Sequence, residues 1–352
     1  MNPVPTTFLL TGGTGYIGSH TCVELLNAGY GAVVLDNLCN SSLAVLDRIE
    51  KITGKRPFFI EGDVRDRAVL DQIFGEHSID AVVHFAALKS VAESVARPLD
   101  YYANNVCGSA SLFDAMDAHG VRRIVFSSSA TVYGVANEMP VGEASPTAPV
   151  NPYGHTKLMV EQMLHDLAAA DRDWRTMCLR YFNPVGAHES GLIGEDPRDT
   201  PNNLVPYVAQ VAIGRLPHLR VFGDDYPTSD GTGVRDYIHV TDLALGHVAA
   251  LQRVMSDIAG GHTVVNLGTG RGHTVLEVVR AFMQASGRPV PYEVVERRPG
   301  DVAVSFADAT VAHSMFGWKA ERDLDRMCAD AWRWQSANPD GYAGDFAMRS
   351  SG

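Results

Sequence analysis

The sequence contains little that would bind a metal ion or form disulfides. Its five cysteines are dispersed without a Cys-x-x-Cys pair, and its thirteen histidines show no His-x-x-x-His spacing. An odd, scattered set of thiols fits reduced cysteines in the cytoplasm, and it predicts neither a disulfide framework nor a zinc site. We therefore expect a cytoplasmic protein without a metal.

Positive charge and long apolar runs are scarce as well. The chain has 29 lysines and arginines against 41 aspartates and glutamates, which gives a formal net charge of −12. This balance argues against a nucleic-acid partner, although a local positive pocket for phosphates is compatible with it. No apolar run approaches the roughly 18 residues that a membrane span needs. The first strand begins at Thr7, so we expect no signal peptide.

Short apolar runs alternate with helical stretches through the first half of the chain. The expected strands are Thr7–Leu10, Ala32–Leu35, Pro57–Ile60, Ala81–Phe85, Arg123–Phe126 and Thr176–Leu179. The expected helices lie near Gly15–Ala28, Leu43–Thr53, Arg67–Phe74, Leu99–His119 and Tyr153–Ala169. Repeated β-α units of this kind predict an α/β fold, a doubly wound parallel (Rossmann) sheet with helices on both faces.

The second half has a different character. From about Phe182 it contains Pro- and Gly-rich connections, including Gly191–Pro201 and Gly223–Gly233, which are typical of ligand-binding loops. We expect residues 1–182 to form a dinucleotide-binding domain and residues 183–352 a smaller C-terminal α/β domain that binds the substrate. A segment near 235–268, with the apolar run Val264–Leu267, is expected to return to the first sheet.

A glycine-rich turn follows the first strand and opens the first helix. In Thr11-Gly12-Gly13-Thr14-Gly15-Tyr16-Ile17-Gly18, glycines at 12, 15 and 18 permit a tight turn and a close approach of the backbone to a pyrophosphate. Asp36 ends the second strand, where its carboxylate can accept hydrogen bonds from the adenosine ribose. It would repel the 2′-phosphate of NADP, and the following residues contain no arginine to accommodate that phosphate. NAD is therefore the expected cofactor, although a structural turn and a solvated aspartate are the plainer interpretations.

Later strand ends point to the same cofactor. Asp63 and Val64 close the third strand, where an adenine would lie, and Phe85 and Ala86 close the fourth. Lys89 follows and could reach a phosphate or a ribose. Each signal is weak alone, but they occur in the order that a doubly wound sheet would use them.

Tyr153 and Lys157 are four residues apart, so both side chains share one helix face. A free tyrosine loses its proton near pH 10, and lowering its pKa by about three units requires about 4 kcal/mol of preferential stabilisation of the phenolate. A neighbouring ammonium and a hydroxyl donor, such as Ser129 at the end of the fifth strand, could supply it. The set predicts carbonyl/alcohol redox chemistry, while a core tyrosine, a solvated lysine and a turn serine remain the plainer alternatives.

These residues and several longer motifs resemble the extended short-chain dehydrogenase/reductase family, and within it the members that invert C4 of UDP-hexoses. The match runs over nearly the whole chain and includes Leu35-Asp36-Asn37-Leu38, Phe126-Ser127-Ser128-Ser129-Ala130-Thr131-Val132-Tyr133-Gly134, Arg180-Tyr181-Phe182-Asn183-Pro184-Val185-Gly186-Ala187 and Gly231-Thr232-Gly233-Val234-Arg235-Asp236-Tyr237-Ile238-His239-Val240. The resemblance implies tightly held NAD, a UDP-hexose substrate and a homodimer whose contact helices lie near 100–118 and 153–169.

The resemblance also implies a mechanism. Tyr153, as phenolate, would take the proton of the sugar 4-hydroxyl while hydride passes from C4 to NAD⁺, and hydride would return to the opposite face of the 4-keto sugar. This would interconvert UDP-glucose and UDP-galactose. Lys157 would lower the tyrosine pKa and hold the nicotinamide ribose, Ser129 would hydrogen-bond the reacting oxygen, and Thr131 would assist. Further NAD contacts carried over are Tyr16, Ile17, Asn37, Asn40 and Asn104.

Substrate contacts are implied in the same way. They are Lys89, Ser129, Tyr153, Tyr181, Asn183, Asn203 and Leu204, with Phe222 against the uracil, Arg235 and Arg298 on the diphosphate, and Asp301 on the uridine ribose. Guanidinium groups suit phosphate oxygens, although a surface salt bridge is the plainer role for either arginine. Ser305 stands where some family members carry a tyrosine, so we hypothesise that UDP-N-acetylglucosamine is accepted as well as UDP-glucose.

Two related activities fit the motifs less well. A 4,6-dehydratase would need acidic residues where Ala130 and Thr131 stand, and a UDP-glucuronate decarboxylase would need a glutamate beside Ser129. A 4-epimerase of another UDP-sugar, a uronate or a pentose, stays open. A non-catalytic NAD-binding sensor also stays open, although such a protein need not keep base, lysine and serine together.

Overall fold

The computed structural model describes residues 6–136, 138–198, 201–256, 260–298 and 301–343. Its central sheet has seven parallel strands in the order β10-β6-β5-β4-β1-β2-β3. They are β1 (Thr7–Thr11), β2 (Gly31–Asp36), β3 (Phe58–Glu61), β4 (Ala81–His84), β5 (Arg123–Ser129), β6 (Arg175–Tyr181) and β10 (Gly261–Leu267). The strand order reverses between β1 and β4, which is the crevice where doubly wound sheets bind dinucleotides. The predicted fold class is confirmed.

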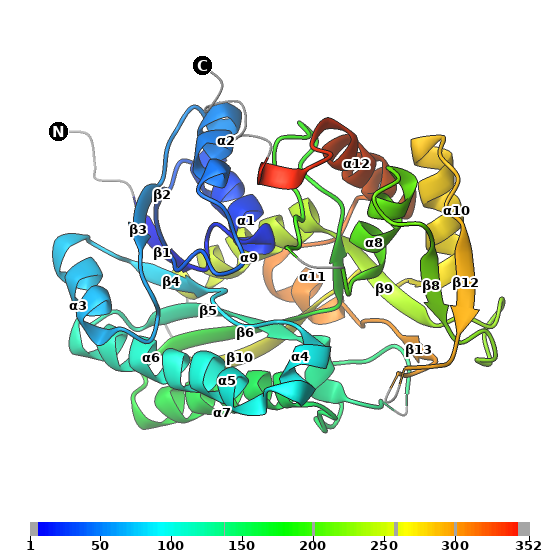
Figure 1. Ribbon diagram of the computed structural model, residues 1–352. Helices are drawn as coiled ribbons and strands as arrows, with labels where there is room; N and C mark the ends of the chain where they lie inside the picture. Colours follow the sequence, from blue (N-terminus) through cyan, green and yellow to red (C-terminus); the bar gives the residue numbers. More distant parts are fainter. Residues whose placement is uncertain (1–5, 137, 199–200, 257–259, 299–300, 344–352) are drawn as a thin grey trace, which may run out of the picture.

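Helices cover both faces of this sheet (Figure 1). On one face lie α1 (Tyr16–Asn27), α2 (Ala44–Thr53) and α9 (Val240–Ser256), and on the other α3 (Arg67–Glu76), α6 (Gly108–Ala118) and α7 (Pro152–Ala170). Neighbouring strand residues divide between the two cores: Leu10 packs with the α1 side and Leu9 with the α3 side. Because both faces are buried, the strands read as continuous apolar runs, which is why the sequence predicts them well.

The helix predicted over Leu99–His119 is less regular than expected. It comprises α5 (Pro98–Tyr101), a π-helical turn η1 (Tyr102–Cys107) and α6. Within the π-turn, Asn105 accepts a hydrogen bond from the Leu88 amide at 2.8 Å and donates one to the Leu88 carbonyl at 3.0 Å. The wider turn therefore ties this helix to the loop after β4, where α4 (Val91–Ala96) also begins.

The second half builds a smaller α/β unit beside the carboxyl ends of the strands (Figure 1). Its strands are β7 (Asn183–Val185), β8 (Leu219–Phe222), β9 (Val234–His239), β11 (Gly272–Thr274), β12 (Tyr292–Val295) and β13 (Val304–Ser305), and its helices are α8 (Leu204–Ala212), α10 (Val275–Ser286) and α12 (Leu324–Ala337). Helix α11 (Thr310–Phe316) instead packs with β10 and α9 in the core of the central sheet. Helices α8, α10 and α12 enclose their own core, which includes Val208, Phe282 and Cys328. Short 3-10 turns, η2 (Ala130–Tyr133) and η3 (Gly341–Ala343), complete the described chain. Across the described ranges, every helix is too short or too polar to span a bilayer.

Candidate functional site

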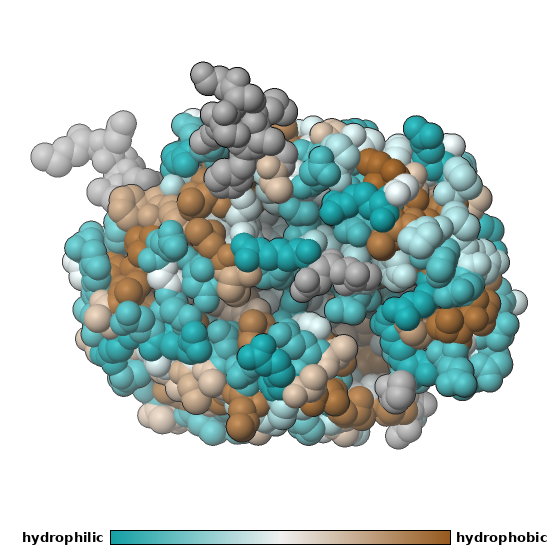
Figure 2. Space-filling view, in the orientation of Figure 1, coloured by the Kyte–Doolittle hydropathy of each residue, from teal (hydrophilic) through white to brown (hydrophobic). Residues whose placement is uncertain are grey.

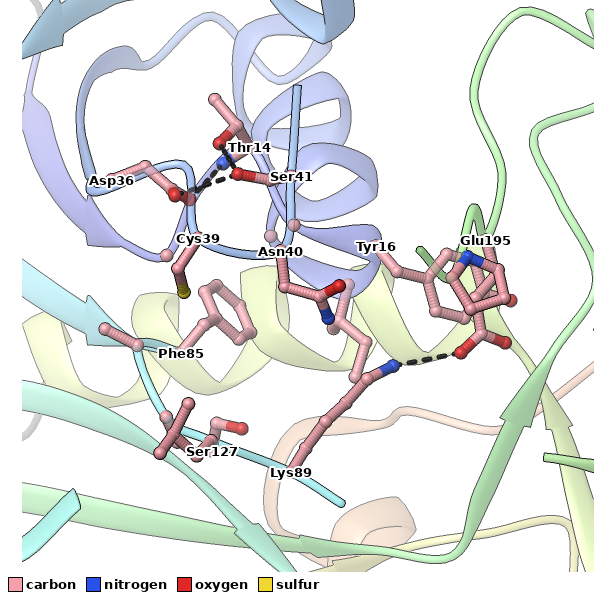
Figure 3. Close-up of a pocket in the computed structure, with 18 of the residues that line it drawn as sticks. Thr14, Tyr16, Asp36, Cys39, Asn40, Ser41, Phe85, Lys89, Ser127 and Glu195 are labelled. Carbon is pink, nitrogen blue, oxygen red and sulfur yellow. Dashed lines mark hydrogen bonds and ion pairs between the residues drawn. The ribbon is translucent and has the colours of Figure 1, made fainter. Parts of the chain in front are cut away.

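A cleft of about 700 Å³ opens at the carboxyl ends of the central strands and extends under the second half of the chain. Figure 3 shows Asp36 of β2, Phe85 directly after β4 and Ser127 of β5 around it, opposite Glu195 from the second half. The predicted residues that line it are Gly12, Gly15, Tyr16, Ile17, Gly18, Asp36, Asn37, Asn40, Val64, Phe85, Ala86, Lys89, Asn104, Ser129, Thr131, Tyr153, Lys157, Tyr181, Asn183 and Asn203.

The glycine turn has the shape that a pyrophosphate requires. Gly12 has a φ of +71°, and a Cβ built there would lie 2.8 Å from the Ala86 amide nitrogen at the end of β4. A Cβ on Gly18 would overlap the Gly12 carbonyl oxygen. Helix α1 begins at Tyr16 directly after the turn, so its N-terminal amides and the positive end of its dipole face the cleft. These features fit a dinucleotide in this cleft.

Asp36 lies at the end of β2 and is nearly buried. Its carboxylate accepts hydrogen bonds from the Thr14 amide at 3.1 Å, the Leu38 amide at 2.9 Å and the Ser41 hydroxyl at 2.9 Å (Figure 3). These donors orient the carboxylate at the cleft wall, where it can accept from a ribose hydroxyl. Asp63 behaves differently: it forms an ion pair with Arg65 at 2.7 Å, and its neighbours Gly62 and Val64 line the cleft instead.

A charged bridge spans the mouth of the cleft. The Lys89 ammonium lies 2.9 Å from a Glu195 carboxylate oxygen (Figure 3). Asn203 donates a hydrogen bond to the same oxygen at 3.0 Å. Lys89 thus reaches across from the dinucleotide half to the loop predicted to carry a ligand site. Glu195 was not singled out from the sequence, although its loop was.

Tyr153 and Lys157 face β5 from the first turns of α7. The Asn151 side chain caps this helix by accepting from the Gly154 amide at 2.9 Å. The Lys157 ammonium donates to the Ser127 carbonyl oxygen at 2.6 Å and lies 5.8 Å from the centre of the Tyr153 ring. The predicted pair therefore shares one helix face, but the ammonium is directed at the strand.

Burial has the largest effect on the pKa values of both members of this pair. Burial raises the pKa of Tyr153 to about 12, and a hydrogen bond with Ser129 acts in the opposite direction. Burial lowers the pKa of Lys157 to about 7. The Lys157 ammonium is bonded to the Ser127 carbonyl and desolvation dominates for both groups, so the effect of Lys157 on the pKa of Tyr153 stays a prediction.

Ser129 is held by its neighbour Thr131. The Thr131 hydroxyl donates to the Ser129 hydroxyl oxygen at 2.9 Å, and the Thr131 amide donates to the same atom at 3.2 Å. With both acceptor positions of Ser129 used, its own proton is left for an oxygen on the cleft side. The arrangement supplies one oriented donor beside the phenol.

The predicted nucleotide-sugar contacts of the second half gather in a separate cluster. The Arg298 guanidinium lies 3.9 Å from the centre of the Phe222 ring, and Arg235 lies 3.5 Å from Asp301. Ser305 pairs with Arg235 between β13 and β9. Partial burial lowers the pKa of Arg298. The negative charge of Asp301 raises this pKa, and the positive charges of Arg220 and Arg235 lower it further. This cluster, like Leu204 at the start of α8, lies outside the walls of the cleft.

Several lining residues were missed by sequence reasoning, including Ser41, Ser127, Asp196, Arg198, Arg215 and Tyr342. Arg198 lies in the predicted ligand loop, of which residues 199–200 fall outside the described ranges, and it donates to the Leu38 carbonyl at 2.7 Å. Tyr342 carried no local signal. It is positioned by Arg48 of α2, which donates to the Leu192 carbonyl at 2.8 Å and lies 4.8 Å from the centre of the Tyr342 ring.

Comparison with known proteins agrees with this geometry. The sequence profile of the NAD dependent epimerase/dehydratase family matches residues 8–268. The UDP-glucose 4-epimerase of Bacillus subtilis is 60% identical over 334 residues, covering 95% of this chain and 98% of that protein. The crystal structure of UDP-glucose-4-epimerase from Stenotrophomonas maltophila, with bound NAD and formylated UDP-arabinopyranose, superposes with a TM-score of 0.93 at 56% identity, covering 95% of this chain and 99% of that one. The enzyme of Bifidobacterium longum, in complex with NAD⁺ and UDP, gives a TM-score of 0.92 at 53% identity, with 96% and 100% covered. The chain therefore belongs to the NAD dependent epimerase/dehydratase family.

Proposed function

We propose that this protein interconverts UDP-glucose and UDP-galactose with tightly held NAD, by transient oxidation at C4 of the sugar. The observation that carries the proposal is the shared cleft: Tyr153 and Ser129 stand on the same wall as Asp36 and the glycine turn at Gly12. A base and a donor within reach of a dinucleotide site are what the oxidation of an alcohol requires.

Each residue has a role in this reaction. Tyr153 accepts the proton of the sugar 4-hydroxyl, and Ser129, oriented by Thr131, donates a hydrogen bond to the reacting oxygen. When bound, NAD supplies the hydride acceptor and, in its oxidised form, a positive charge beside the phenol. Lys157 holds the cofactor ribose while bonded to the Ser127 carbonyl. Epimerisation further requires the 4-keto sugar to turn over beside the cofactor.

The second half of the chain recognises the nucleotide in this proposal. Arg235 and Arg298 bind the diphosphate, Phe222 packs on the uracil and Asp301 contacts the ribose. The concentration of guanidinium groups near Arg298 supports this assignment, because guanidinium forks pair well with phosphate oxygens. We thus propose that residues 1–182 and a segment near 235–268 form the NAD-binding domain. The other described residues of 183–352 form the UDP-sugar-binding domain.

Ser305 widens the expected substrate range. A hydroxymethyl group in place of a phenol ring leaves room near the sugar C2, so we propose that UDP-N-acetylglucosamine is also a substrate. The test is epimerisation of both sugars by the wild-type protein and by Ser305→Tyr. No N-acetyl activity, or unchanged selectivity in the variant, would contradict this part of the proposal.

A second candidate is a 4-epimerase of a pentose. It is favoured by the formylated UDP-arabinopyranose in the Stenotrophomonas maltophila structure. Rates across a panel of UDP-hexoses, UDP-pentoses and UDP-uronates separate the two, since the preferred substrate has the highest kcat/KM.

We also propose a cytoplasmic homodimer. Apolar side chains are exposed along α4, α5 and α7, with Val95 at 63%, Leu99 at 79% and Met159 at 44%. Figure 2 shows hydrophobic surface along the edge where Figure 1 places these helices. Several exposed apolar side chains on neighbouring helices are consistent with an interaction site. Sedimentation of wild type and Leu99→Glu tests the assembly: a monomeric wild type would refute it.

The central experiment needs no added cofactor. The purified protein is denatured and the supernatant is assayed for NAD, and the native protein is supplied with UDP-galactose. Release of NAD and formation of UDP-glucose are expected, whereas NAD without turnover would identify a sensor. Tyr153→Phe should retain NAD and lose at least about 100-fold in kcat. Full activity in this variant would refute the role of Tyr153.

A further inference from the structure

A buried ion pair lies behind the catalytic residues, away from the cleft. Glu161 follows Lys157 by one turn of α7, and Arg180 comes from β6. Their side chains are only 4% and 7% exposed. The Arg180 Nε donates to Glu161 Oε1 at 2.9 Å, and its Nη2 donates to Oε2 at 2.6 Å. This two-pronged geometry fixes the carboxylate in one orientation.

Further contacts hold the pair in place. Ser128 donates a hydrogen bond to Glu161, and the Arg180 guanidinium lies 4.8 Å from the centre of the Tyr133 ring. Tyr133 in turn donates to the Asn266 side chain at 2.7 Å. Burying an ion pair is costly, and well-packed apolar residues are often as stable. Stability alone is therefore a weak reason for charges at this place.

The groups around Lys157 show what the pair can do. Facing Lys157 are Tyr153 and Glu161 from its own helix, the Ser127 carbonyl and the Phe126 ring from β5, Cys178 from β6 and His84 from β4.

Two of these groups are neutral. Burial lowers the pKa of His84 to about 3, with Lys157 adding to the effect, and burial raises the pKa of the Cys178 thiol. Among the described residues that face it, Glu161 is thus the carboxylate that stabilises the Lys157 ammonium against desolvation.

We propose that Glu161 is a positioning residue for the epimerase reaction: held by Arg180 and Ser128, its carboxylate keeps Lys157 cationic on the cleft side during turnover. The role rests on the proposed function, because it acts through Lys157 on the reacting groups. It differs from a structural role, because Glu161 lies behind the cleft wall and a change there reaches the reaction through the charge of Lys157.

The test is the pH dependence of kcat for the NAD-loaded protein and its Glu161→Gln variant, with UDP-galactose as substrate. Without the carboxylate, Lys157 loses its proton at lower pH, so the alkaline limb of kcat shifts down by about one unit or more. At a pH above the shifted limb, kcat falls about tenfold or more. The acid limb and KM stay unchanged, because Glu161 is not among the lining residues.

Two further variants separate charge from packing. Glu161→Gln leaves Arg180 buried without its partner, so the double variant Glu161→Gln/Arg180→Met removes both charges and should regain thermal stability while keeping the shifted limb. Glu161→Asp retains the anion and should restore the alkaline limb. Asp166→Asn, an exposed carboxylate on the same helix, should match the wild type.

The outcomes are distinct. An unshifted alkaline limb in Glu161→Gln, or a pH-independent loss that the double variant reverses, would overturn the role of Glu161 alone. A wild-type protein that does not epimerise UDP-sugars would overturn the proposed function and this role together.

Discussion

The hydrogen bond between Ser129 and the phenol of Tyr153 sets the pH at which the base forms. Burial raises the pKa of Tyr153 to about 12, and Ser129 is the donor that lowers it. A hydrogen bond to a charged group contributes about 1.5–3 kcal/mol, and one pKa unit corresponds to about 1.4 kcal/mol. Ser129→Ala should therefore move the acid limb of kcat/KM, which reports the enzyme before the sugar takes the Ser129 proton, to higher pH by about 1–2 units. Since only the phenolate reacts, kcat/KM below that limb should fall about 10–100-fold.

The assay is kcat/KM against pH for NAD-loaded wild type and Ser129→Ala. Loss of the bond to the sugar oxygen lowers kcat/KM at every pH, so the position of the limb, rather than its height, is diagnostic. Thr131→Val is the graded comparison, because it removes the hydroxyl donor to Ser129 while the amide at 3.2 Å remains. The acid limb of Thr131→Val should also move to higher pH, but by less than that of Ser129→Ala. An acid limb of Ser129→Ala that coincides with the wild type would refute the reasoning.

The remaining predictions concern the dinucleotide half. Gly12→Ala places a Cβ 2.8 Å from the Ala86 amide at a φ of +71°, so NAD should be lost during gel filtration and the melting temperature should fall. Gly54→Ala is the control, because Gly54 has a φ of +70° but no atom within 4 Å of the added Cβ. This variant should lose only the about 1–2 kcal/mol of stability that the left-handed backbone costs, and it should keep NAD. Asp36→Asn removes the charge that repels a 2′-phosphate, so the ratio of Kd values for NADP and NAD, measured by titration of the NAD-free protein, should narrow; an unchanged ratio would contradict the role of Asp36. Lys89→Met breaks the half-exposed ion pair with Glu195, so the melting temperature should hardly change. NAD should dissociate faster from this variant than from the wild type in a stopped-flow exchange. Equal dissociation rates would show that the ion pair does not retain the cofactor.

The dinucleotide half could be predicted because its patterns are local. Strands buried on both faces are continuous apolar runs, and β1, β2 and β6 lie within two residues of their predicted bounds. The glycine turn needs Gly12 both for its positive φ and for the absence of a Cβ beside Ala86, so the residue type itself indicates the geometry.

The rest depends on contacts between distant parts of the chain. The π-turn at Tyr102–Cys107 leaves no mark in a helical pattern, and its reason is the distant Leu88 backbone. The direction of the Lys157 ammonium follows from a carbonyl on β5, which spacing along α7 cannot reveal. Glu195 and Tyr342 line the cleft through tertiary contacts, so their residue types alone did not mark them.

The contact between Arg48 and Tyr342 affects when the cleft can form as the protein folds during synthesis. One wall of the dinucleotide cleft begins at Gly12 and another is formed by Tyr342 and Ala343, so the compartment closes only after this entire span has left the ribosome. Contacts so far apart in sequence form slowly. A nascent chain can assemble most of the parallel sheet early, but the cofactor is expected to be captured later, once Tyr342 and Ala343 have been made.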